Sequence, residues 1–286
     1  MKKNLLFIFS LLSLQNVAQS GLIPANKIRL GSFLTPPEYK KEYGIYSEFN
    51  KRMGLAAKYI AKNPPTATSD FHASLDRIAL IRRDFAIFSS GIENPRYGRS
   101  IRLQAYQAPN QSMVDTLYEV NPELRFFEKK PTVSRHRPFL DKVKSIYSKK
   151  GDEAFDSIHI SGMNISLSHS MKYPEGWVSQ YKEIYQIRHP SFSDTVLIAD
   201  YAIEQMVSAF SEQPWNFDKI ANSYRLLCHA TLWEAGTPSI LESFLDGMFR
   251  SRGFAFPRKK SEPFWSALLH QREEGAYTWK KFMSNF

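Results

Sequence analysis

The sequence contains a single cysteine, Cys228, among 286 residues, so no disulfide can form within the chain. Cys228 falls on the apolar face of a predicted helix, where a buried small hydrophobic side chain is expected rather than a nucleophile. Long apolar runs are also scarce. The longest, residues 5–14, is shorter than the roughly 20 residues that a membrane-spanning helix needs. We therefore expect no transmembrane segment in the mature chain.

Several catalytic and cofactor-binding motifs are missing. The sequence has no Walker loop, no Gly-x-Gly-x-x-Gly and no Gly-x-Ser-x-Gly elbow. Its seven histidines include no His-x-x-x-His or His-Glu-x-x-His pair, which are the spacings that bind zinc on a helix. We therefore predict no metal site and no resident cofactor.

The N-terminus has the order of segments that is typical of a Sec-type secretory signal. Lys2 and Lys3 precede the apolar run, and Ala18-Gln19-Ser20 follows it with small residues at both ends. We predict cleavage before Gly21 and export to the periplasm, the extracellular space or a host cell. An uncleaved anchor or a buried first helix is the alternative. The absence of disulfides does not contradict export, because exported bacterial proteins without disulfides are common.

The chain is basic, with a formal net charge of +10 that falls to +8 when Lys2 and Lys3 are subtracted. Such a charge favours acidic partners, among them nucleic acid, anionic lipid and nucleotide phosphates. The basic residues are scattered in pairs and triplets, however, and none reaches the run of five to eight that marks a nucleic-acid patch. Nucleic acid is therefore not the expected partner, and a solvated basic surface is the simpler interpretation.

The spacing of apolar residues predicts an α+β fold that is mainly α-helical. Apolar residues recur at helical intervals within residues 46–60, 71–85, 139–147, 196–210, 220–231 and 240–249. Residues 157–170 instead alternate on both sides of Gly162, as a small β-hairpin does. The last three helices are the most apolar and are expected to form the core.

Gly236-Thr237-Pro238 begins the last of these helices and is a candidate anion site. Thr237 is expected at the N-cap and Pro238 at the first helical position. The backbone N–H groups of Ser239 and Ile240 then lack partners within the helix and lie beside two hydroxyls, an arrangement that binds phosphate. A plain helix start is the alternative, since most such sequences have no ligand.

Residues 132–265, and most strongly 220–257, resemble the Fido-fold effectors of the avirulence protein B family, which are relatives of Fic proteins. The family motif is similar to His-Trp-x-x-Ala-x-Ala-Met-Pro-x-x-Arg-Gly-Ser-Ala-x-Ile-x-Glu. It aligns without a gap and matches Ala230, Gly236, Thr237, Ile240 and Glu242. Upstream, residues 161–167 resemble the family's His-Gly-x-x-Ile-x-Leu hairpin, and residues 137–139 a Lys-Pro-Tyr near its ligand pocket. We therefore divide the chain into three segments: the signal peptide over residues 1–20, an N-terminal helical region over 21–125 that the resemblance does not cover, and a Fido-like core over 126–286.

The resemblance also implies a function, that of an exported effector or toxin. Such a protein transfers a glycosyl or nucleotidyl group from a nucleotide or nucleotide-sugar donor to a hydroxyl of a target protein in the host. The candidate catalytic residues are His189 and Arg137. The candidate residues for binding the donor's phosphates are Gly236, Thr237, Ser239, Tyr224, Arg225 and His229.

Two departures from the motif concern the phosphates. Tyr224 stands where the family has histidine, and Ala235 stands where it has the arginine that faces the phosphates. An arginine clamp contributes about 1.5–3 kcal/mol for each hydrogen bond to a charged group, and alanine contributes none of it. The alternative is therefore a catalytically degenerate Fido-like scaffold that binds a host or target protein. A basic nucleic-acid-binding protein is a third hypothesis, which a steep dependence of binding on salt would support.

Overall fold

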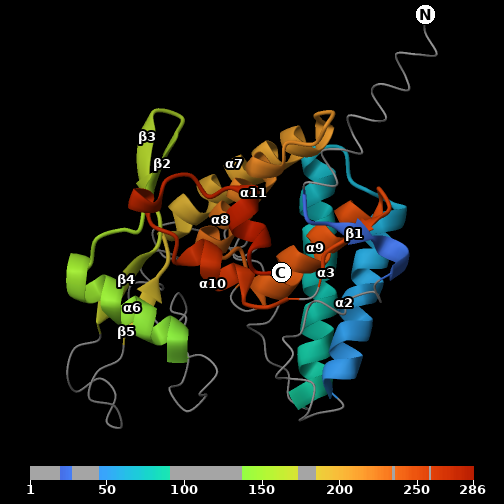
Figure 1. Cartoon of the computed structure of the whole chain (residues 1–286), viewed down its shortest axis with the longest axis horizontal. Helices are drawn as coiled ribbons and strands as arrows, with labels where there is room; N and C mark the ends of the chain where they lie inside the picture. The colour runs from blue at the N-terminus through green and yellow to red at the C-terminus, as the bar shows by residue number, and fades with distance from the viewer. Residues whose placement is uncertain (1–19, 28–44, 91–136, 173–184, 234–235, 258) are drawn as a thin grey trace, which may run out of the picture.

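The computed structural model describes residues 20–27, 45–90, 137–172, 185–233, 236–257 and 259–286, and all structural statements concern these residues (Figure 1). Most of the predicted signal peptide and the predicted boundary near residue 126 lie outside them. The described helices are α2 (Ile45–Lys62), α3 (Thr68–Ser90), α6 (Arg137–Lys150), α7 (Phe192–Ser211), α8 (Phe217–Ala230), α9 (Thr237–Arg250), α10 (Pro263–Leu268) and α11 (Trp279–Met283), with the 3-10 turns η1 (Ala25–Lys27) and η5 (Arg272–Glu274).

The described strands form three separate antiparallel pairs. The pairs are β1 (Ile23–Pro24) with β6 (Phe254–Ala255), β2 (Ser157–Ile160) with β3 (Met163–Ser166), and β4 (His169–Lys172) with β5 (Tyr185–Arg188). The predicted α+β, mainly helical fold is therefore confirmed. None of the described helices is both long and apolar enough to cross a membrane.

The predicted β-hairpin is present as β2 and β3, which project from the body of the molecule (Figure 1). Ile160 pairs with Met163, so a two-residue turn of Ser161 and Gly162 joins the strands. Both turn residues have positive φ, 49° and 82°, as in the type I′ turns that match the twist of a hairpin. Glycine adopts this conformation without the steric cost that serine incurs.

The N-terminal and C-terminal helices share one hydrophobic core. The long helices α2 and α3 pack against α9, on the right of Figure 1. The close approach of α2 to α9 depends on Gly247, because a Cβ atom there would lie 2.5 Å from Cβ of Ile60 and 2.7 Å from the carbonyl oxygen of Ala57. Any larger residue at position 247 would push the two helices apart.

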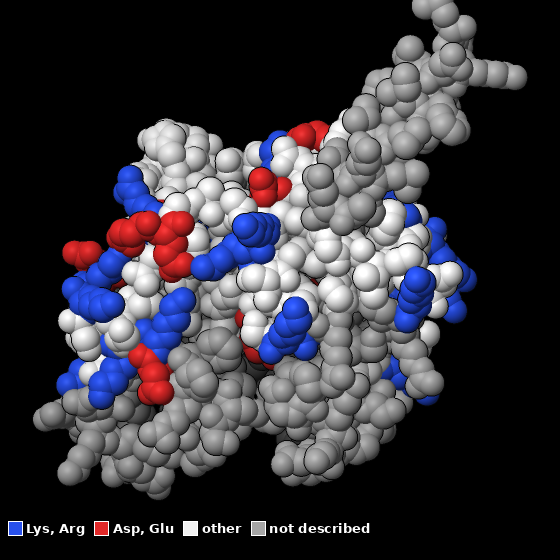
Figure 2. All heavy atoms as spheres, viewed as in Figure 1, with Lys and Arg blue, Asp and Glu red and all other residues white. Residues whose placement is uncertain are grey.

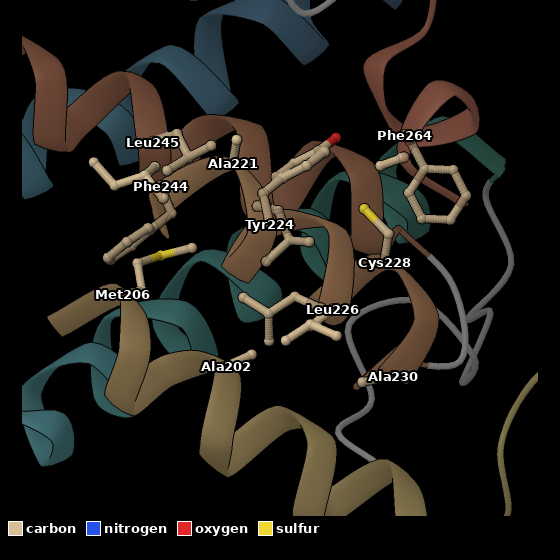
Figure 3. Packing of buried hydrophobic residues seen from close by; sticks show 14 of the residues in the cluster. Ala202, Met206, Ala221, Tyr224, Leu226, Cys228, Ala230, Phe244, Leu245 and Phe264 are labelled. Atoms are coloured by element: carbon tan, nitrogen blue, oxygen red, sulfur yellow. The ribbon is translucent and has the colours of Figure 1, made fainter. Parts of the chain in front are cut away.

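The centre of the core lies between α7, α8 and α9, as the sequence predicted. Figure 3 shows side chains from the three helices meeting there, among them Met206 of α7, Leu226 of α8 and Phe244 of α9. Cys228 lies on α8 with no exposed surface, and burial raises the pKa of its thiol well above the usual range. The prediction of a buried cysteine is confirmed.

The N-terminal segment 20–27 is bound to the C-terminal part of the chain. Trp279 donates a hydrogen bond of 2.8 Å from Nε1 to the carbonyl oxygen of Ser20, and Leu22 is buried. The backbone N–H of Ala25 donates to the carbonyl oxygen of Gly253 at 2.9 Å, next to the β1–β6 pair. These contacts join residues more than 200 positions apart in the sequence.

Candidate functional site

The start of α9 differs from the predicted geometry. Gly236, with φ of 91°, is the N-cap and Thr237 the first helical residue, so the expectation of a Thr237 cap was wrong. The Thr237 hydroxyl is fully buried and donates to the carbonyl oxygen of Trp233 at 3.2 Å. The Ser239 hydroxyl donates to the carbonyl oxygen of Gly236 at 2.9 Å. Both hydroxyl protons predicted to hold an anion are therefore used by the protein's own backbone.

Tyr224, another candidate for phosphate binding, belongs to the core. Its side chain has no exposed surface, its hydroxyl lies 3.4 Å from Oε1 of Glu242, and its ring packs on Phe282 with centroids 5.0 Å apart. Burial raises the pKa of Tyr224 well above its usual value. One residue advances an α-helix by about 100°, so the neighbouring Arg225 points to a different side of α8.

Arg225 is buried and paired with an acidic residue. Its Nη2 atom lies 2.7 Å from Oδ2 of Asp156, and its side chain is only 5% exposed. Asp156 precedes β2, and its second carboxylate oxygen accepts the backbone N–H of Ser157 at 2.8 Å. The ion pair holds the hairpin against α8, and it offsets the positive charge that Arg225 was predicted to offer a ligand.

His189 and His229 meet in a buried cluster with Ser168, which lies between β3 and β4. Nδ1 of His189 is 3.0 Å from the carbonyl oxygen of His229 and 3.1 Å from the Ser168 hydroxyl. A carbonyl oxygen can only accept, so Nδ1 of His189 carries a proton. The backbone N–H of Ser168 donates to Nδ1 of His229 at 3.3 Å. We call Ser168, His189, His229 and the Arg225–Asp156 pair the histidine cluster.

The hydrogen bond from Ser168 fixes the tautomer of His229. Its Nδ1 atom accepts, so the proton of the neutral ring is on Nε2. Burial lowers the pKa of His229 well below its usual value, and the positive charge of Arg225 adds to the effect. His229 is fully buried, and its Nε2 atom has no hydrogen-bond partner among the described residues. Trp233, four residues after His229, also has a buried Nε1 atom without a hydrogen-bond partner among the described residues.

Arg137, the second catalytic candidate, is the first residue of α6, but its side chain lies outside the described part of the structure. Helix α6 packs on β4 and β5, and His189 follows β5 directly. The structure thus brings three of the predicted site residues together, namely His189, Arg225 and His229. It places Tyr224 in the core and Thr237 and Ser239 against the backbone.

Sequence reasoning missed Ser168 and Asp156. Neither residue lies in a recognisable motif, and each becomes part of the cluster through a partner 61 or 69 positions away. Only the fold brings such residues together.

No protein-family model matches the chain, and a search of curated proteins finds no match. The Fido resemblance therefore stays a prediction.

Proposed function

We propose that the chain is an exported effector or toxin of the Fido type. It would transfer a glycosyl or nucleotidyl group from a nucleotide-linked donor to a hydroxyl of a target protein. The observation that carries the proposal is the buried Nε2–H group of His229, which has no acceptor among the described residues and lies in the region that the resemblance assigns to the donor.

An unpaired buried donor costs a folded protein about 1–3 kcal/mol. Proteins tolerate such a group where a ligand supplies its partner, and the partner of an N–H donor is an oxygen. A phosphate or sugar oxygen of the donor molecule would accept from Nε2 of His229. Because burial keeps the His229 ring neutral, its Nε2–H group would donate to this oxygen throughout the pH range around 7.

His189 has the geometry of a general base in this scheme. Its Nδ1 proton is directed to the carbonyl oxygen of His229, so the neutral ring keeps its lone pair on Nε2. That atom would take the proton of the acceptor hydroxyl as the new bond to the transferred group forms and the bond to the donor's phosphate breaks. Catalysis would then depend on positioning and on hydrogen bonds to the departing phosphate, with no covalent intermediate.

Titration calorimetry with nucleoside diphosphates and nucleotide sugars tests the proposal. His229→Asn keeps an acceptor near the position of Nδ1 for Ser168 and removes the Nε2–H group. We expect it to weaken binding by about 10- to 100-fold, the loss of one hydrogen bond to a charged group. His229→Gln places an amide donor near the position of Nε2 and should restore most of the affinity. His159→Asn, on the exposed face of the hairpin, is the matched control.

A second candidate function is a catalytically degenerate scaffold that binds a target protein. The pairing of Arg225 with Asp156 favours it, because together with Ala235 it leaves the start of α9 without the arginine of the family motif. If the wild-type protein binds no nucleotide in the calorimeter, the transferase proposal fails and the scaffold remains.

A further inference from the structure

Helix α2 has two faces of different chemistry. Its inner face packs on α9 and α3, and its apolar residues there are at most 2% exposed: Met53, Ala56, Ala57 and Ile60. At 3.6 residues per turn, the remaining large side chains between residues 51 and 62 fall within an arc of about 120°. This arc, the outer face of α2, consists of Lys51, Arg52, Leu55, Lys58, Tyr59 and Lys62. Four of these six residues are basic, and Glu48, by its position in the helix, falls within the same arc one turn before Arg52.

The outer face also exposes apolar surface. Leu55 is 54% exposed and Tyr59 is 42% exposed, and Leu80 of the adjacent helix α3 is 48% exposed. The guanidinium of Arg77 lies 4.4 Å over the Tyr59 ring, so the ring is held beside α3 by a cation–π contact. Figure 2 shows Lys and Arg side chains at the edge of the molecule where Figure 1 places α2.

We propose that the outer face of α2 docks on an anionic membrane surface. A helix face that combines lysines with leucine and tyrosine is the kind that lies in the membrane interface. Lys58 and Lys62 would reach lipid phosphates and carboxylates while their stems cover apolar surface. Leu55 would enter the boundary between headgroups and acyl chains, and Tyr59 would lie at headgroup level, where its ring and its hydroxyl both find suitable surroundings.

The exposed leucine is the reason for choosing lipid over nucleic acid. A phosphate backbone pairs with lysines and stacks on aromatic rings, but it offers nothing to an aliphatic side chain at the centre of the face. Two acidic residues of α3, Asp76 and Asp84, are each four positions from Leu80 and lie on its side of that helix, so the proposed contact is centred on α2. The inference does not depend on the proposed transferase activity.

Co-sedimentation with lipid vesicles tests the docking. The purified protein should bind vesicles of phosphatidylcholine mixed with phosphatidylserine, should bind those of phosphatidylcholine alone much less, and should dissociate as salt is added. The apolar run of residues 5–14 is the same in all variants, and its contribution to vesicle binding does not depend on the charge of the lipid. The difference between the two kinds of vesicle therefore reports on the basic face.

Two double variants separate the contribution of the basic residues to vesicle binding from that of the apolar residues. Lys58→Ser with Lys62→Ser should lower partitioning about 25-fold, because each cation near an anionic surface contributes about fivefold. Leu55→Ser with Tyr59→Ser should also lower it, by at least tenfold. The matched controls are Met163→Ser at the tip of the hairpin, where the methionine is 48% exposed, and Lys280→Ser on α11. Both controls should bind like the wild type.

Three results would overturn the proposal. The lysine double variant could bind as well as the wild type, or Lys280→Ser could lose as much per lysine as the double variant does. The third result has two parts. A single-stranded oligonucleotide would bind to the wild type but not to the Lys58→Ser, Lys62→Ser variant, and the Leu55→Ser, Tyr59→Ser variant would bind vesicles as well as the wild type does. This last result would identify the face as a polyanion site and not a lipid site.

Discussion

Replacing Glu242 with glutamine should stabilise the protein at pH 8, although it removes one end of a buried ion pair. Nζ of Lys259 lies 2.7 Å from Oε2 of Glu242 and 3.3 Å from Oε2 of Glu262. The side chains of Glu242 and Lys259 are 2% and 3% exposed. Lys259 therefore forms ion pairs with two carboxylates, and the more deeply buried of the two is that of Glu242. Burial raises the pKa of Glu242 from 4.5 to about 7, with Lys259 opposing the shift and Glu262 adding to it.

The direction of the pH effect follows from proton binding. Between pH 4.5 and 7 the folded chain keeps a proton on Glu242 that the unfolded chain has lost, so the free energy of unfolding falls as the pH rises through this window. A shift of one pKa unit corresponds to 1.36 kcal/mol, so the whole shift lowers stability by about 3 kcal/mol by pH 8. Glutamine resembles the protonated acid, carries no charge to bury and still offers an oxygen to Tyr224 and Lys259.

Urea denaturation from pH 4.5 to 8 measures this effect. We expect Glu242→Gln to match the wild type near pH 4.5 and to exceed its unfolding free energy by up to about 3 kcal/mol at pH 8. Glu262→Gln, at a more exposed position, is the control and should change the pH dependence less. If Glu242→Gln is the less stable protein at pH 8 by more than about 1 kcal/mol, the ion pair with Lys259 outweighs the cost of burial and the reasoning is refuted.

Three further predictions concern packing and local conformation. Gly247→Ala should lower the free energy of unfolding by at least about 2 kcal/mol in urea denaturation, because the new Cβ would overlap Ile60; an unchanged midpoint would show that α2 can move away without cost. Cys228 should react with a maleimide only in denaturant, and rapid labelling of the folded protein, followed by mass spectrometry, would contradict its position in the core. Ser161→Asn should raise the free energy of unfolding by roughly 0.5 kcal/mol, and with it the thermal midpoint, because asparagine tolerates positive φ better than serine. Ser166→Asn, on a strand of the same hairpin, should raise neither.

The local parts of the fold could be predicted from the sequence because local rules determine them. Alternation around Gly162 predicted the hairpin, and the periodicity of residues 240–249 predicted the core helix α9. The ends of the helices were less predictable. The helix predicted over residues 71–85 extends over Thr68–Ser90, and its added first turn, residues 68–70, is polar and carries no apolar signal.

The site was only partly predictable, for a different reason. The sequence nominated His189 as a catalytic residue and Arg225 and His229 as residues that bind the donor's phosphates. In the structure all three are buried, Arg225 is paired with Asp156, and His229 is held neutral by burial. Whether a basic side chain is charged and available depends on neighbours that lie some 60 or 70 positions away, and no local pattern contains that information.

The tight contact at Gly247 has a consequence for where an acceptor could be. Helix α9 begins at Thr237, in the segment of chain that follows His229, and α2 packs against α9 at Gly247, ten residues later. At 1.5 Å per residue, plus the width of one helix, the outer face of α2 lies within about 30 Å of that segment. If both proposals hold, the active site lies within about 30 Å of the bilayer surface. The natural acceptors would then be proteins anchored to the same membrane, and dissolved proteins would be poor substrates.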